Sequence, residues 1–103
     1  TMVGGATLTK LLGTSAWYAP GAAGAFVAEA ILHDQKKMVP CSVALEGEYG
    51  ENDICCGVPV ILGKNGVEKI VELPLNEEEK AKFAASAAAV RKTNAALTEV
   101  GAL

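Results

Sequence analysis

Residues that could perform chemistry are few in this sequence, and they lie far apart. The chain of 103 residues has one histidine, His33, and one arginine, Arg91. A nucleophilic triad needs a histidine as general base, and Ser15 has no histidine near it in the sequence. Bidentate binding of a carboxylate needs an arginine, and Arg91 falls in the middle of a predicted helix. The residues alone therefore predict no catalytic group and no self-sufficient enzyme.

The three cysteines are Cys41, Cys55 and Cys56. The adjacent pair would point to opposite faces of a strand, which disfavours a disulfide between them. The Cys-Cys pair also lacks the Cys-x-x-Cys spacing of common zinc and redox sites, and a single histidine gives no cluster of ligands. We expect buried, reduced thiols in a cytoplasmic protein, and no metal site.

Other polar clusters have simple structural explanations. His33 lies near the expected end of a helix, where a partly protonated imidazole interacts favourably with the helix dipole. The carboxylates within 46–53 lie in a predicted exposed loop, and Glu77–Glu79 suit the start of a helix. Neither "GGAT" nor "GKNG" has the spacing of a phosphate-binding loop.

The composition is that of one globular domain. Half of the residues are hydrophobic, 20% are charged, and the formal net charge is −3. The absence of a basic block argues against nucleic acid or an anionic membrane as partner. No apolar run approaches the ~20 residues that cross a bilayer.

Two helices are predicted at the start of the chain. Residues 3–12 repeat apolar positions at helical spacing, and Gly13 fits the end of that helix. A second helix is expected from close to Pro20 to Leu32, because proline is tolerated in a first turn but not in the middle of a helix. Its apolar stripe consists of Ala22, Ala23, Phe26, Val27, Ala30 and Ile31.

Residues 36–73 predict three antiparallel strands. In the first strand, Val39, Cys41, Val43 and Leu45 occupy alternate positions. Because Pro40 has no N–H to donate to a neighbouring strand, this strand starts near Pro40 or lies at an edge of the sheet. The loop 46–53 leads to a second strand, and Asn65-Gly66 predicts a tight hairpin before a third strand over 67–73. The inward face of the second strand is expected to hold Ile54, Cys56, Val58, Val60 and Leu62.

A last helix is predicted from Asn76 to about Leu97. Asn76 and Glu79 have the spacing of an N-cap and its capping-box partner, and Glu78 and Lys82 form an i, i+4 pair. One face is expected to hold Phe83, Ala87, Val90 and Leu97. The fold class is therefore α+β, with helices flanking an antiparallel three-stranded meander.

Three stretches resemble the C-terminal part of the lactate/malate dehydrogenase family. They are "GTSAWYAPGAAGAFVAEAIL" (13–32), the segment 36–83 that includes "CSVALEGEYG" and "GVPVILGKNGVEKIVEL", and "SAAAVRKTNAAL" (86–97). The match covers nearly the whole chain. Its detail is most similar to the lactate-dehydrogenase-like malate dehydrogenases of bacteria.

The resemblance implies that residues 1–103 form part of the C-terminal substrate domain of an NAD-dependent 2-hydroxy-acid dehydrogenase. In such enzymes a Rossmann domain precedes this part and binds the dinucleotide. A His–Asp pair and substrate-binding arginines also lie there, so none of these can be assigned to a residue of this chain. Because the sequence begins Thr1-Met2, we expect this chain to be a segment of a longer protein, and the segment lacks the Rossmann domain.

The resemblance assigns roles to three residues near the start. Ser15 and Ala16 would line the substrate pocket, and Pro20 would pack near the nicotinamide of NAD. Small residues at 15 and 16 would leave room for the second carboxyl group of malate or oxaloacetate. The expected activity is reversible oxidation of (S)-malate by NAD in the intact enzyme. The helix that starts near Pro20 would pack in subunit contacts of a homo-oligomer, a dimer or tetramer, or only within the domain.

Two alternatives remain open at this stage. One is an L-lactate dehydrogenase, because the family distinguishes the two substrates mainly through a mobile loop that this chain does not contain. The other is a non-catalytic α+β oligomerisation module.

Overall fold

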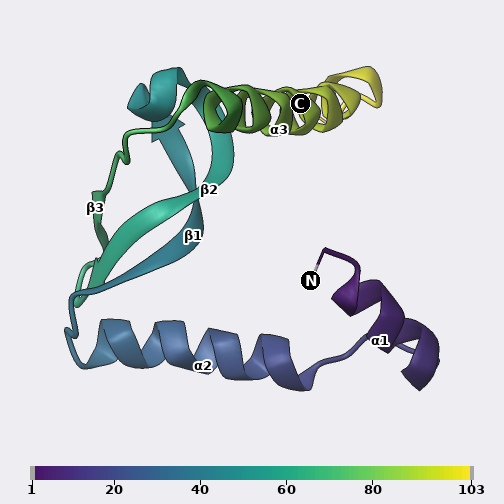
Figure 1. Ribbon diagram of the computed structural model, residues 1–103, viewed down its shortest axis with the longest axis vertical. Helices are drawn as coiled ribbons and strands as arrows, with labels where there is room; N and C mark the ends of the chain where they lie inside the picture. Colours follow the sequence, from purple (N-terminus) through teal and green to yellow (C-terminus); the bar gives the residue numbers. More distant parts are fainter. Residues whose placement is uncertain (1, 103) are drawn as a thin grey trace.

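The computed structural model describes residues 2–102, which form three helices and one sheet (Figure 1). The helices are α1 (Gly4–Leu12), α2 (Tyr18–Leu32) and α3 (Glu77–Glu99), and the strands are β1 (Lys37–Glu46), β2 (Asn52–Gly63) and β3 (Gly66–Ile70). The sheet lies between α2 and α3, and α1 lies past the N-terminal end of α2. The predicted α+β class is confirmed. Within residues 2–102, no helix is long and apolar enough to cross a membrane.

The sheet is an antiparallel meander in the order β1-β2-β3. Pro40 pairs with Pro59 near the middle of the first ladder, on an edge strand as expected. The predicted tight hairpin is present, and its Gly66 has a φ of 83°. β3 is shorter than expected and ends at Ile70; the N–H of Val71 still donates to Pro59 O (2.9 Å), and the N–H of Leu73 donates to Tyr49 Oη (2.8 Å) instead of to β2.

Each ladder contains one β-bulge. Leu45 pairs with Ile54 while Glu46 pairs with Asn52, which leaves Asp53 as the extra residue of β2. In the second ladder Val67 pairs with Leu62 and Lys69 pairs with Ile61, which leaves Glu68 as the extra residue of β3. A bulge bends its strand and changes the direction of a side chain, so both bulges redirect carboxylates near the ends of β2.

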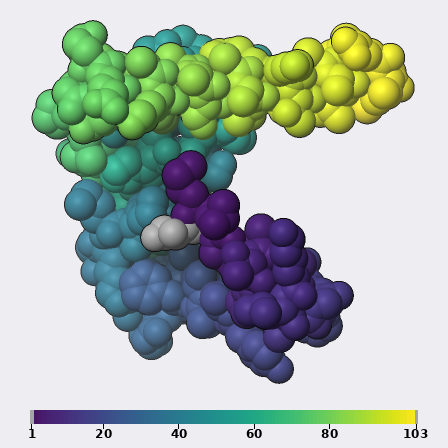
Figure 2. All heavy atoms as spheres, turned by 45° about the vertical axis from the view of Figure 1, so that its right-hand side comes forward, coloured from purple at the N-terminus to yellow at the C-terminus, as the bar shows by residue number. Residues whose placement is uncertain are grey.

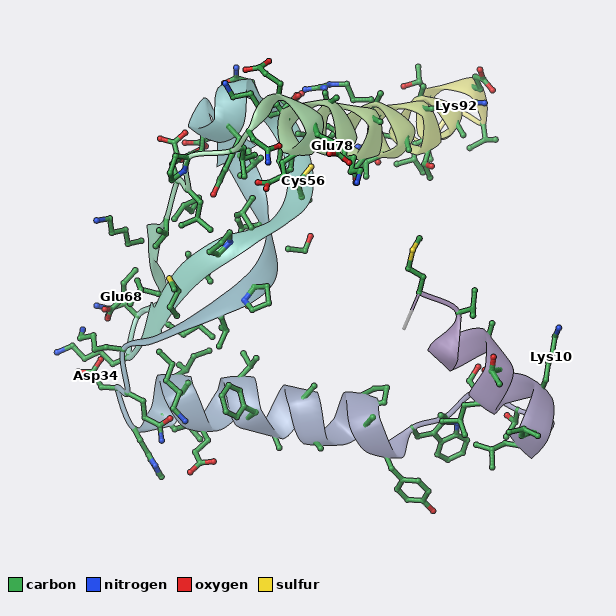
Figure 3. All side chains as sticks on the ribbon, in the orientation of Figure 1. Lys10, Asp34, Cys56, Glu68, Glu78 and Lys92 are labelled. Atoms are coloured by element: carbon green, nitrogen blue, oxygen red, sulfur yellow. The ribbon has the colours of Figure 1, made fainter. Side chains whose placement is uncertain are left out.

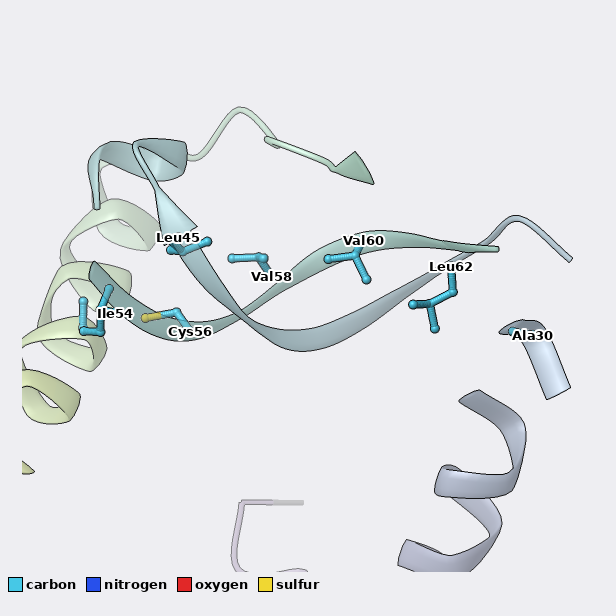
Figure 4. Close-up of a cluster of buried hydrophobic side chains, with 8 residues drawn as sticks. Ala30, Leu45, Ile54, Cys56, Val58, Val60 and Leu62 are labelled. Atoms are coloured by element: carbon cyan, nitrogen blue, oxygen red, sulfur yellow. The ribbon is translucent and has the colours of Figure 1, made fainter. Parts of the chain in front are cut away.

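The core follows one face of β2. The five predicted residues of that face are all buried, and Leu45 of β1, Ala30 of α2 and Ala87 of α3 complete the cluster (Figure 4). The expectation that all three cysteines are buried is wrong. Cys56 is buried and Cys41 half-buried, but Cys55 is exposed, because neighbouring residues of a strand point to opposite faces and only one face of β2 is covered.

The two N-terminal helices begin and end close to the predicted positions. Gly13 caps α1 in the left-handed conformation (φ 75°). α2 begins at Tyr18, so that Pro20 lies in its first turn. Ala30 is the buried residue of α2, and α1 buries none of its residues, so α1 contributes nothing to the buried core.

α3 begins at the predicted cap and extends beyond the sheet. Asn76 Oδ1 accepts the N–H of Glu79 (2.8 Å), and Glu79 Oε1 accepts from the side-chain amide of Asn76 (3.0 Å). Ala87 packs into the core with Phe83 and Val90 beside it, whereas Leu97 is 43% exposed. The C-terminal half of α3 projects past the rest of the molecule (Figure 2).

Candidate functional site

Ser15 and Ala16 lie in a short irregular segment between α1 and α2. The left-handed turn at Gly13 ends α1, and its N–H donates to Thr9 O (2.9 Å). At the start of α2, the N–H of Gly21 donates to Trp17 O (2.9 Å). The segment between these two turns makes no helical hydrogen bonds, which allows its side chains to face a ligand.

This segment forms the wall of a hollow of about 250 Å³. That volume is a little below the ~300–1,000 Å³ of sites for drug-sized ligands, which suits a small organic acid. Ala16 is half-buried and Ser15 is exposed. The lining residues are Leu12, Thr14, Ser15, Ala16, Trp17 and Tyr18.

Pro20 does not line this hollow. Its ring is exposed in the first turn of α2, two residues after Tyr18. Ser15 and Ala16 are therefore brought together at one hollow, and Pro20 is outside it. The sequence gave no sign of Leu12, which lines the hollow because α1 ends beside the segment.

The two residues that could act as a base or bind a carboxylate lie elsewhere. His33 caps the opposite end of α2, and a helix of 15 residues is about 22 Å long. Arg91 lies on α3, where it donates to Asn52 O (3.2 Å) and pairs with Glu51. Arg91 thus holds the start of β2 to α3 and is not directed at the hollow.

A second hollow, of about 380 Å³, lies between the β1–β2 connection and the start of α3. Tyr49 and Phe83 form its apolar wall, with ring centroids 5.2 Å apart. Its two carboxylates are already engaged, since Glu51 pairs with Arg91 and Glu72 accepts the N–H of Tyr49 (2.7 Å). These contacts make it a packing region at the corner of the fold.

Electrostatic effects concentrate at two places away from the hollow. The N–H of Lys64, together with the Lys36 ammonium, lowers the pKa of Asp34, and Glu68 followed by Asp34 raises the pKa of Lys36. The N–H of Glu46 lowers the pKa of Glu48. Among residues 2–102, no three His, Cys, Asp or Glu side chains are grouped to hold a metal ion.

The sequence of the chain matches a known protein family over residues 2–100. That family is described as "lactate/malate dehydrogenase, alpha/beta C-terminal domain". The malate dehydrogenase of Bacteroides fragilis is 85% identical over all 103 residues, which make up 33% of that protein. The chain therefore spans about a third of the length of the curated relatives it matches.

Solved structures agree with the sequence match. The malate dehydrogenase of Salinibacter ruber superimposes with a TM-score of 0.89 at 45% identity, over 96% of this chain and 33% of that one. The lactate dehydrogenase of Eimeria maxima with NADH and oxamate gives a TM-score of 0.92 at 39% identity, over 97% of this chain and 32% of that one. The chain therefore belongs to the lactate/malate dehydrogenase family and has the fold of its α/β C-terminal domain.

Proposed function

We propose that this chain serves as the C-terminal third of a malate dehydrogenase, which interconverts (S)-malate and oxaloacetate with NAD. The observation that carries the proposal is 85% identity over the complete chain to a protein named malate dehydrogenase. The similarity to a lactate dehydrogenase is much lower, at 39% identity, so malate is the favoured substrate. The family membership also argues against an unrelated oligomerisation module.

The hollow beside Ser15 supports this proposal through its size and chemistry. Oxidation of malate removes a hydride from the carbon that bears the hydroxyl group and a proton from that hydroxyl group. Ser15 offers a hydroxyl group for hydrogen bonding, and Ala16 adds only a methyl group to the wall. Together they leave space for the second carboxyl group of a four-carbon acid. The proton acceptor and the carboxylate-binding arginines would come from a preceding domain.

The exposure of Pro20 is compatible with contact to a nicotinamide ring. The exposed pyrrolidine ring of Pro20 provides an apolar surface in the first turn of α2, which suits contact with a ring better than with a phosphate. When bound, NAD would accept the hydride. Pro20 would contribute one wall and exclude water from that side, while a Rossmann domain would bind the rest of the dinucleotide.

We also propose a homo-oligomer in the cytoplasm. Trp17 and Tyr18 are 73% and 93% exposed, and Phe26 is 45% exposed on the same helix. Such apolar exposure is typical of surfaces that a further domain or subunit covers. Three free thiols are compatible with a reducing compartment.

A chimeric enzyme tests the proposed function. We would join this chain to the N-terminal two thirds of the Bacteroides fragilis malate dehydrogenase and follow NADH oxidation with oxaloacetate. Because 85% of the exchanged residues are identical, we expect kcat/KM within about threefold of the parent enzyme. A chimera that folds and binds NADH but does not reduce oxaloacetate would contradict the proposal.

A further inference from the structure

Three charged side chains join the C-terminal end of α2 to the sheet. Lys36 Nζ lies 2.6 Å from Glu68 Oε2 and 3.1 Å from Asp34 Oδ1. Asp34 Oδ1 also accepts the N–H of Lys64 (2.9 Å) from the β2–β3 hairpin. Figure 3 shows Asp34 and Glu68 together at this corner of the molecule. We call Asp34, Lys36 and Glu68 the junction cluster.

The backbone around the junction cluster is shaped to bring the three side chains together. Glu68 is the extra residue of the β3 bulge, and its side chain is only 17% exposed. Asp34 and Lys36 both have positive φ, at 48° and 55°, a conformation that is unfavourable for residues other than glycine. A Cβ at Gly63 would lie 2.5 Å from Glu68 Oε1 and 2.7 Å from Asp34 Oδ1. A side chain at position 63 would therefore displace these two carboxylates.

α2 is held to the sheet near one end. Its buried residue is Ala30, and Val27 packs partly against the core, whereas its N-terminal residues are exposed. A helix about 22 Å long that tilts by about 5° at one end moves its other end by about 2 Å. The end that would move carries Ser15 and Ala16.

Apolar contact alone defines the angle of α2 poorly. The hydrophobic effect is non-directional, and the contacts of α2 with the sheet, including the ring of Phe26 under Lys37 Nζ (4.4 Å), are confined to the C-terminal half of the helix. An ion pair with hydrogen-bonded geometry fixes both distance and direction, and the junction cluster supplies such contacts from the residues directly after α2. Lys36 bridges Asp34, in the turn after the helix, and Glu68, in the sheet.

We propose that the junction cluster sets the angle of α2 against the sheet and thereby holds Ser15 and Ala16 at the substrate. Lys36 and Glu68 are then positioning residues that act on the reaction from the far end of the helix. This inference rests on the proposed malate dehydrogenase function. It adds a control of substrate binding by residues that do not touch the substrate.

Four variants of the chimeric enzyme test the inference. Glu68→Gln and Lys36→Met each remove one partner of the ion pair, and Lys36→Arg keeps the charge. Lys82→Met is the matched control, since Lys82 pairs with Glu78 at 2.9 Å on α3. We expect the first two variants to raise KM for oxaloacetate about fivefold, because small misplacements of a pocket wall weaken productive binding. In these two variants, KM for NADH should stay within about twofold of the value for the unsubstituted chimera. In Lys36→Arg and Lys82→Met, the KM values for oxaloacetate and for NADH should both stay within about twofold of that chimera.

A purely structural role gives a different result. Loss of folded enzyme lowers the apparent kcat and leaves both KM values unchanged, and that pattern in Glu68→Gln and Lys36→Met would overturn the inference. An equal rise of KM in Lys82→Met would overturn it as well. The activity of the unsubstituted chimera reports on the proposed function separately.

Hydrogen exchange followed by mass spectrometry tests the inference without using activity. In Glu68→Gln, peptides from 13–24 should exchange at least about threefold faster, while peptides from α3 keep their rate, because only α2 loses its fixed angle. Equal acceleration in both regions, or none in 13–24, would rule out the positioning role. This measurement remains decisive even if the unsubstituted chimera proves inactive on oxaloacetate.

Discussion

Ala16 is the half-buried residue in the segment that joins α1 and α2. Its methyl group and the hydroxyl group of Ser15 face a hollow whose other walls include Trp17 and Tyr18. A small residue at this position leaves the hollow open, and the large aromatic side chains give it depth. If the hollow receives the second carboxyl group of oxaloacetate, the size of residue 16 limits substrate binding directly.

Replacing Ala16 tests this assignment. Ala16→Leu adds three carbon atoms to the wall, and we expect kcat/KM of the chimera for oxaloacetate to fall on the order of 100-fold, since a displaced substrate loses alignment. Ala85→Leu is the control, because Ala85 is exposed on α3. Steady-state kinetics with oxaloacetate and NADH provide the measurement. Unchanged kinetics in Ala16→Leu would remove Ala16 from the pocket.

At the scale of elements, Tyr49 connects two parts of the fold that the strands do not join. It lies in the short 3-10 turn Glu48–Gly50 with a φ of 56°. Its hydroxyl group donates to Val71 O (2.6 Å) and accepts the N–H of Leu73 (2.8 Å), and its ring packs on Phe83. Tyr49 thus links the β1–β2 connection to the segment that leads into α3.

Tyr49→Phe should destabilise the protein measurably. The substitution keeps the ring but leaves the N–H of Leu73 and the C=O of Val71 without their partner, which costs about 1–3 kcal/mol. We expect the urea midpoint of the chimera to fall with an unchanged m value. Tyr18→Phe is the control, because Tyr18 is 93% exposed and its loss of a hydroxyl group should have little effect. Equal midpoints for the two variants would contradict this role.

A structural feature can be predicted from the sequence when residues close together in the chain determine it, and not when it depends on contacts between distant residues. The inward face of β2 from Ile54 to Leu62 was predictable, because alternation needs only neighbouring residues. The bulge at Glu68 was not predictable, because it depends on how β3 pairs with β2. The ion pair of Lys36 with Glu68 was equally hidden, since it joins residues 32 positions apart. Ser15 and Ala16 were reached through resemblance, because their small side chains have no distinctive spacing.

The molecule is less compact than a typical folded chain of the same length. Its radius of gyration is 16.2 Å, whereas a compact chain of this length has about 13 Å. Its accessible surface is 7621 Å², against about 5,500 Å² for a folded monomer of this mass. The excess of about 2,000 Å² on this chain alone is more than the ~800 Å² that each partner contributes to an interface of standard size. We infer that another domain, a subunit or both cover the surfaces of α1, α2 and the end of α3.

The isolated 103-residue chain should therefore behave differently from the chimera. Exposed side chains such as Leu11 (79%), Trp17 (73%) and Val100 (76%) would drive self-association and binding of the dye ANS, since large apolar patches on soluble chains find partners. Sedimentation velocity and ANS fluorescence measure both effects. The chimera should show neither the heterogeneous aggregates nor the dye binding, because its N-terminal part covers these surfaces. A monodisperse isolated monomer that binds no ANS would mean that the open arrangement is stable without a covering partner.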